Sequence, residues 1–126
     1  MSETAKCKTI KMWDKVYGCY IYISYGCSMK ELSKQTLKYM GKESSQGCGT
    51  ATDGMSQVFT TKDNHSCYWA WTEKKDLPVL IHELTHIAFR VLDDRGINLH
   101  GHNTEPLCYY LAFIFEEFLK QNRGAI

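Results

Sequence analysis

Alternating and periodic apolar positions along the chain predict a few short elements separated by polar segments. Residues 17–25 are rich in aromatic and β-branched side chains that alternate between two faces, which is typical of a strand. The residues on one of these faces are Tyr17, Cys19, Ile21, Ile23 and Tyr25. Two further strands, at 57–61 and 66–72, are separated by a polar turn at 62–65 and predict a β-hairpin.

Capping residues mark both ends of the first predicted helix. Ser28 followed by Glu31 is a capping-box start, and Gly41 supplies a C-terminal stop, so a helix is predicted over 29–40. Its apolar stripe is modest, which indicates an amphipathic helix with one buried side. The segment 41–54 that follows is rich in glycine and serine and is expected to be a loop.

Two longer helices are predicted in the second half of the chain. One begins at Asp76 and ends at Gly96, and the other begins at Thr104 and runs to about Gln121. Each starting residue is followed two positions later by a proline, which favours the first turn of a helix. The order of elements predicts an α+β fold, in which a small β-sheet of one strand and one hairpin packs with three helices in a single domain, 1–126.

Composition and charge exclude several classes of protein. With 44% hydrophobic and 23% charged residues, the chain is typical of a globular domain rather than a disordered or fibrous one. Its formal net charge of +1 gives no strong field for polyanions, so neither nucleic acid nor a membrane is expected as a partner. No apolar run approaches the roughly 20 residues that span a bilayer, and no secretory signal is recognisable, which predicts a cytoplasmic protein.

The six cysteines are not arranged as a redox or zinc-binding pair. No two of them have the Cys-x-x-Cys spacing, and a cytoplasmic compartment keeps thiols reduced. All six are therefore expected to be free.

His82, Glu83 and His86 form a His-Glu-x-x-His motif. The motif lies within residues 79–88, inside the helix predicted to begin at Asp76. Because a helix turns by about 100° per residue, the two histidines lie about 40° apart and one turn along, so both imidazoles can reach one metal ion. Nitrogen ligands at this spacing suit Zn²⁺. Glu83 lies one residue from a ligand, where its carboxylate can accept a proton from zinc-bound water without binding the metal itself.

The apolar residues of the same helix fall on a separate arc of roughly 140°, which is expected to pack against the sheet. The histidines then point from the opposite side toward a cleft. The residues of the apolar arc are Leu77, Leu80, Ile81, Leu84, Ile87, Ala88, Val91 and Leu92.

With this motif the sequence resembles the zincin metallopeptidases, whose longer pattern also requires uncharged residues around the histidines, as in 79–88. Short peptidases encoded by phages and bacteria are also similar. The resemblance implies a minimal zincin-like domain with a third ligand downstream. The metzincin type needs Gly and His where this chain has Phe89 and Leu92, whereas the gluzincin type takes a Glu from a following antiparallel helix. The resemblance therefore implies Glu105, at the start of such a helix, as the third ligand.

Two histidines compete with Glu105 for this role. His100 and His102 lie in a loop that could fold back over the metal. Asp93 also projects near the histidine face, but two turns beyond the second histidine it is about 10 Å along the axis, too far for a ligand bond of about 2 Å. In familiar gluzincins the Asp of an Asn-Glu-x-x-Ser-Asp stretch orients the first histidine. That stretch is replaced here, so Tyr109 or a backbone carbonyl must orient His82.

Together these residues predict a zinc-dependent metalloprotease that hydrolyses peptide bonds in a peptide or protein substrate, in the host cytoplasm if a phage encodes it. Glu83 activates the water and passes its proton to the departing amine, and His102 or Tyr109 is a candidate second donor to the oxyanion. An edge of the hairpin is expected to pair with an extended peptide. The alternative is a zinc-stabilised binding or assembly module that keeps the motif without turnover.

Overall fold

The computed structural model describes residues 7–41, 53–60, 66–99 and 103–122. Its elements in chain order are β1 (Thr9–Asp14), β2 (Cys19–Tyr25), α1 (Met29–Met40), β3 (Gly54–Thr60), β4 (Ser66–Thr72), α2 (Leu77–Asp94) and α3 (Glu105–Gln121). Within the described residues, no helix is long and apolar enough to cross a membrane.

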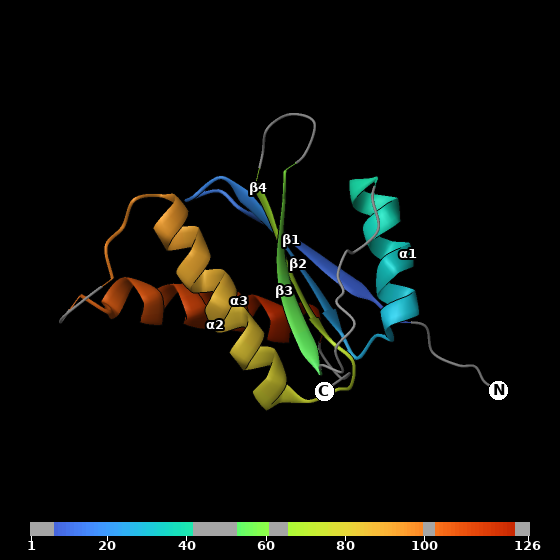
Figure 1. The fold of residues 1–126 in the computed structure, drawn as a ribbon. Helices are drawn as coiled ribbons and strands as arrows, with labels where there is room; N and C mark the ends of the chain where they lie inside the picture. The colour runs from blue at the N-terminus through green and yellow to red at the C-terminus, as the bar shows by residue number, and fades with distance from the viewer. Residues whose placement is uncertain (1–6, 42–52, 61–65, 100–102, 123–126) are drawn as a thin grey trace.

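The four strands form one mixed sheet in the order β1-β2-β4-β3. β1 pairs antiparallel with β2, β2 pairs parallel with β4, and β3 pairs antiparallel with β4, with Gly54 opposite Thr72. Helices α2 and α3 cover one face of this sheet and α1 covers the other (Figure 1). The predicted α+β class, with a small sheet beside three helices, is confirmed.

All three predicted helices are present. Of the predicted N-terminal caps, Ser28 and Asp76 form side-chain hydrogen bonds and Thr104 does not, while Gly41 ends α1 in the left-handed conformation as predicted. Ser28 Oγ accepts a hydrogen bond from the backbone N–H of Glu31 (3.1 Å), and Asp76 Oδ1 accepts one from Val79 N (3.2 Å). Gly96 follows α2 with a positive φ of 78°, a conformation that a glycine adopts without steric cost. Local capping chemistry therefore sets the bounds of α1 and α2.

The structure adds a strand that the sequence patterns did not predict. β1 alternates between inward Ile10, Met12 and Asp14 and outward residues, but its apolar pattern is broken because Asp14 is buried and Trp13 is exposed. A tight turn joins it to β2, in which Gly18 N donates to Asp14 O (2.8 Å). This turn takes up the first two residues of the strand predicted at 17–25.

The hairpin of β3 and β4 is confirmed, with β3 beginning at Gly54 rather than at the predicted residue 57. Most of the predicted loop 41–54 and the predicted turn 62–65 lie outside the described residues. β3 is the last strand at its end of the sheet.

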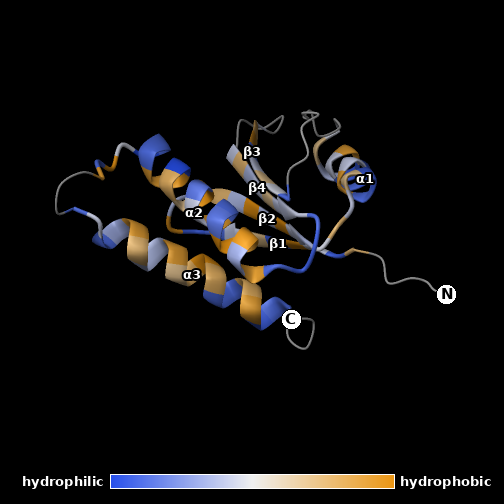
Figure 2. Ribbon diagram, turned by 60° about the horizontal axis from the view of Figure 1, so that its bottom comes forward, coloured by the Kyte–Doolittle hydropathy of each residue, from blue (hydrophilic) through white to orange (hydrophobic). Residues whose placement is uncertain are grey.

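Each face of the sheet has its own core. The core under α2 and α3 is large and mainly aliphatic, as the hydrophobic segments of these two helices indicate (Figure 2). Its fully buried members include Ile21, Ile23, Leu80, Leu84, Ile114 and Phe118. The core under α1 is smaller and rich in aromatic rings. Its buried members are Tyr22, Cys27, Leu32, Phe59, Cys67, Trp69 and Trp71.

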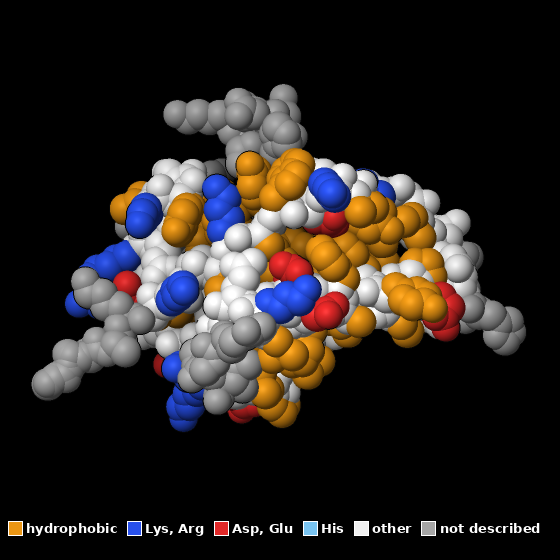
Figure 3. All heavy atoms as spheres, turned by 180° about the vertical axis from the view of Figure 1, so that it is seen from behind, with side chains coloured by type: hydrophobic (Ala, Val, Ile, Leu, Met, Phe, Trp, Pro, Cys, Tyr) orange, Lys and Arg blue, Asp and Glu red, His pale blue; other side chains and the backbone are white. Residues whose placement is uncertain are grey.

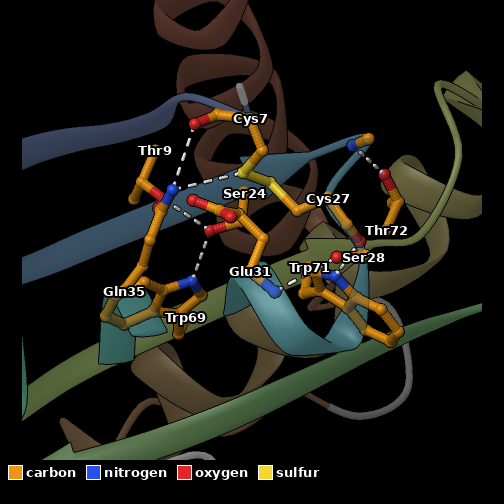
Figure 4. Close-up of a disulfide and its surroundings, with 11 residues drawn as sticks. Cys7, Thr9, Ser24, Cys27, Ser28, Glu31, Gln35, Trp69, Trp71 and Thr72 are labelled. Carbon is orange, nitrogen blue, oxygen red and sulfur yellow. Dashed lines mark hydrogen bonds between the residues drawn. A yellow bond between two sulfur atoms is a disulfide. The ribbon is translucent and has the colours of Figure 1, made fainter. Parts of the chain in front are cut away.

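A disulfide joins Cys7, just before β1, to Cys27, just after β2 (Figure 4). The prediction of six free thiols is therefore wrong for this pair. Gln35 Nε2 from α1 donates to Cys7 O (3.1 Å) and contacts Cys7 Sγ (3.3 Å), while the buried indole of Trp71 donates to Cys27 O (2.6 Å). Sequence spacing did not reveal the pair because the two cysteines meet only when β1 and β2 pair. Cys19, Cys67 and Cys108 are free.

Candidate metal and catalytic site

The motif residues lie on the first half of α2, which is anchored by its apolar stripe. Six residues of the predicted arc are buried, namely Leu80, Leu84, Ile87, Ala88, Val91 and Leu92. Leu77 is partly buried against the same core, but Ile81 is 39% exposed, so the predicted arc was too wide on this side. Because the buried stripe fixes the rotation of the helix, His82 and His86 are left on its exposed side.

The two histidine side chains come together at their outer ring nitrogens. Nε2 of His82 and Nε2 of His86 are 3.3 Å apart, and the rings are nearly perpendicular, at 83°. Two zinc–nitrogen bonds of about 2.0–2.1 Å at a tetrahedral angle would separate the two nitrogens by about 3.3–3.4 Å. The pair therefore fits two positions of one tetrahedral zinc ion.

Glu83 is set apart from its neighbours by burial, since only 8% of this residue is exposed. Burial raises the pKa of its carboxyl above the ordinary value, while the charges of the two histidines and a hydrogen bond from Ser56 act in the opposite direction without cancelling that effect. A carboxylate with a raised pKa is better matched to accepting a proton near neutral pH.

Glycine at position 54 allows β3 to approach α2 closely beside Glu83. A Cβ atom placed on Gly54 would lie 2.8 Å from Val79 Cγ1, 2.9 Å from Trp71 O and 3.2 Å from Glu83 Cγ. Any larger residue would push β3 and α2 apart. Gly54 and Ser56 thus hold Glu83 from the strand side, and sequence reasoning missed both. Their only signal was a glycine and a serine two residues apart where a loop gives way to a strand.

Two hollows flank the motif residues. One, of about 360 Å³, is lined by Asp53, Gly54, Pro78, Val79, His82 and Glu83. The other, of about 560 Å³, is lined by Ser56, Gln57, Val58, Tyr68, His86, Ile87, Phe89, Arg90 and Asp93. Both are formed between residues of β3 and α2 or immediately beside them. His82 lines the first hollow and His86 lines the second, so each histidine faces a hollow that borders β3.

The structure does not bring the predicted third ligand to the histidine pair. Glu105 is the exposed first residue of α3. Among the described residues, no group of three or more His, Cys, Asp or Glu side chains could hold a metal ion. The competing His100 and His102 lie outside the described residues. Tyr109 was predicted either to orient His82 or to donate a hydrogen bond to the oxyanion. It is 73% exposed and lines a different cavity, next to β1.

Comparison of the chain with protein-family models, with curated proteins and with solved structures gives no match. The functional assignment therefore depends on the site itself.

Proposed function

We propose that this protein hydrolyses peptide bonds in a zinc-dependent reaction, with His82 and His86 as zinc ligands and Glu83 as the general base. The observation that carries the proposal is the 3.3 Å separation of the two Nε2 atoms, which fits a tetrahedral zinc ion. The buried carboxyl between them in sequence supports it, because a structural zinc site has no need of a base.

The chemistry is divided between the metal and the chain. Bound zinc supplies a Lewis acid that makes water acidic near neutral pH and polarises a carbonyl oxygen. Glu83 accepts a proton from the attacking water and donates it to the nitrogen of the departing amine, so the glutamate returns to its starting state after each turnover. Ser56, which donates to the Glu83 carboxylate, keeps that carboxylate oriented between the two transfers.

The substrate is proposed to be an extended peptide that lies along β3. This strand ends the sheet, and the two hollows lie between it and α2 on either side of the histidines. A strand at the end of a sheet can receive a peptide as an additional strand, which would carry the scissile bond past the site.

The third ligand is proposed to be Glu105, the first residue of α3, with His100 and His102 as alternatives, although the described residues do not bring a third ligand to the histidine pair. Removing a ligand weakens zinc affinity far more than removing a neighbouring group does. Zinc affinity should therefore fall most in Glu105→Ala among the three single alanine variants. A larger loss in His102→Ala or His100→Ala would transfer the role to that histidine and leave the remaining assignment intact.

The decisive experiment compares Glu83→Gln with wild type. The amide keeps the size of the side chain but cannot accept the proton, so peptide cleavage should fall by at least about 10²-fold while zinc content stays at one per chain. Glu116→Gln, an exposed change on α3, is the matched control and should retain wild-type activity. A peptide-library digest identifies a substrate, and elemental analysis measures the zinc.

Two outcomes would contradict this proposal in different ways. A folded protein that takes up no zinc when zinc is offered would remove the metal site altogether. Stoichiometric zinc with equal digests from wild type and Glu83→Gln would indicate a zinc-stabilised binding module instead of a peptidase.

A further inference from the structure

A third cavity, of about 380 Å³, lies between the β1–β2 turn and the first half of α3. It is lined by Asp14, Val16, Tyr17, Pro106, Tyr109, Tyr110 and Phe113. It shares no lining residue with the two hollows beside the histidines. The face seen from behind in Figure 3, where α3 lies, carries many hydrophobic side chains, and Tyr109 and Phe113 of this cavity are exposed.

Four of the seven lining residues are aromatic, namely Tyr17, Tyr109, Tyr110 and Phe113. The rings of Tyr17 and Tyr110 are 5.0 Å apart and meet at 89°, whereas Tyr110 and Phe113 are 6.0 Å apart and nearly parallel, at 20°. The cavity therefore has aromatic walls in two perpendicular orientations. Aromatic side chains in different orientations thus line the cavity, and the faces of aromatic rings attract cations.

A buried carboxylate lies against these rings. Asp14 is only 2% exposed, and its oxygens accept hydrogen bonds from Tyr110 Oη (2.5 Å), Val16 N (2.8 Å) and Tyr17 N (3.4 Å). All three donors are neutral groups, so none of these hydrogen bonds is an ion pair. Among the described residues, no lysine or arginine lines the cavity, although Arg95 keeps its positive charge beside it, where Nε donates to the backbone oxygen of the lining residue Tyr17 (2.8 Å).

The hydrogen-bonding state of Asp14 selects among possible cations. Burial, followed by the hydrogen bond to Asp14, strongly raises the pKa of Tyr110, so its hydroxyl remains a donor at any ordinary pH. With three donors already in place, the carboxylate has little capacity left for the N–H groups of a lysine or an arginine. A cation without N–H groups needs no hydrogen bond to the carboxylate. It can still be attracted by the carboxylate of Asp14 and by the aromatic rings.

We propose that the cavity between β1 and α3 binds a quaternary ammonium group, held by the faces of Tyr17, Tyr109, Tyr110 and Phe113 and by the charge of Asp14. This inference is independent of the zinc site. Quaternary ammonium occurs both in free choline-like compounds and in trimethylated lysine side chains, and both present the same group to the cavity.

Binding is measured by NMR chemical-shift titration of the wild-type chain. Choline is compared with 3,3-dimethylbutan-1-ol, a neutral isostere in which carbon replaces the charged nitrogen. Choline should bind at millimolar concentration and at least about tenfold more tightly than the alcohol, since a cation–π contribution of that size is usual at partly desolvated sites. A peptide with trimethyllysine, titrated against the same peptide with unmodified lysine, tests the other source of the group.

Variants at the exposed Tyr109 separate ring attraction from simple apolar contact without disturbing the core. Tyr109→Phe should retain choline binding, whereas Tyr109→Leu and Tyr109→Ala should weaken it several-fold because the ring face is lost. Leu119→Ala, an exposed change farther along α3, is the control and should leave binding unchanged. Equal affinity for choline and the alcohol, equal binding by the Phe and Leu variants, or absence of shifts at Tyr17 and Phe113 would each overturn the proposal.

Discussion

The sheet face under α2 and α3 has a large, mainly aliphatic core, whereas the face under α1 has a smaller core built from aromatic rings. Two helices cover the first face, and their buried stripes interlock with the sheet (Figure 1). A single helix of twelve residues covers the second, with only Leu32 and Thr36 buried. Among the described residues, α1 is the one helix on that face, and the disulfide and Gln35 supply further links there.

The two faces differ in how their helices are held against the sheet. On the α2 face, packing alone fixes the rotation of the helix, so His82 and His86 keep their outward positions without cross-links. On the α1 face, covalent and hydrogen-bonded links hold a lightly packed helix in place. A catalytic group needs a rigid support, and the motif lies on the better-packed face.

The largest expected effect is on the free energy of unfolding, when one buried leucine on each face of the sheet is changed to alanine. Leu84→Ala should lower the free energy of unfolding by about 3–5 kcal/mol, because its fully buried site is surrounded by rigid aliphatic neighbours. Leu32→Ala should cost less, about 2–3 kcal/mol, since partly buried methionines beside it can move into the space. Urea unfolding of both variants measures the difference, and equal losses would remove the contrast between the two cores.

The disulfide provides the next largest effect, confined to the α1 face. Cys7→Ser should lower the free energy of unfolding by about 3 kcal/mol, the loop-closure value for the sequence separation of 20 residues. Cys108→Ser, at an exposed free thiol, is the control and should change little. A reductant should bring wild type to the level of Cys7→Ser. If the reductant changes nothing and both thiols titrate, the bond is not part of the stable fold.

The contact between β3 and α2 gives a smaller effect that reaches the site. Gly54→Ala should cost about 1–3 kcal/mol of stability, because its Cβ would meet the backbone oxygen of Trp71, which cannot turn aside as a side chain can. Val58→Ala, an exposed change in the same strand, should cost well under this amount. Urea unfolding compares the two variants. Wild-type stability in Gly54→Ala would show that β3 and α2 are not held as closely as described.

How much of this could be predicted from the sequence depended on whether the signal was local. The bounds of α1 and α2 follow from capping residues such as Ser28 and Asp76, and the alternation of β2 follows from its own side chains. β1 was missed because its alternation is short and ends with an exposed Trp13 and a buried Asp14, and its pairing with β2 decides its structure. Ile81 was predicted to be buried because the width of an apolar arc does not reveal where the neighbouring elements end.

The candidate site divides in the same way. Spacing along one helix predicted the meeting of His82 and His86, since the two histidines lie one turn apart. The contacts of Glu83 with Gly54 and Ser56 depend on how a distant strand packs, and no local pattern carries that information. The Cys7–Cys27 bond has the same origin, and it runs against the reducing compartment predicted from the absence of an export signal.

The smallest expected effect tests a polar link on the α2 face, where packing already dominates. Asp94 Oδ2 accepts a hydrogen bond from the buried Tyr68 hydroxyl (2.6 Å), and its Oδ1 pairs with Arg90 Nε (3.1 Å). Partial burial opposes ionisation of Asp94, but the bonds from Tyr68 and Arg90 and the charges of Arg90 and Arg95 outweigh it and lower its pKa. Burial, and then the bond to Asp94, raises the pKa of Tyr68 to about 12, so this hydroxyl donates throughout the neutral range.

A lowered carboxyl pKa makes a contribution that is present above the unfolded-state pKa of about 3.9 and disappears as pH falls through the folded-state value. Asp94→Asn should therefore destabilise the protein at pH near 7 by at most about 1 kcal/mol, since solvent screens this half-exposed pair. The gap between variant and wild type in urea unfolding should close in strong acid. Asp93→Asn, at the neighbouring exposed position, controls for the loss of a charge. A gap that persists in acid would mean that Asp94 contributes through shape rather than charge, and an equal gap in Asp93→Asn would make net charge the cause.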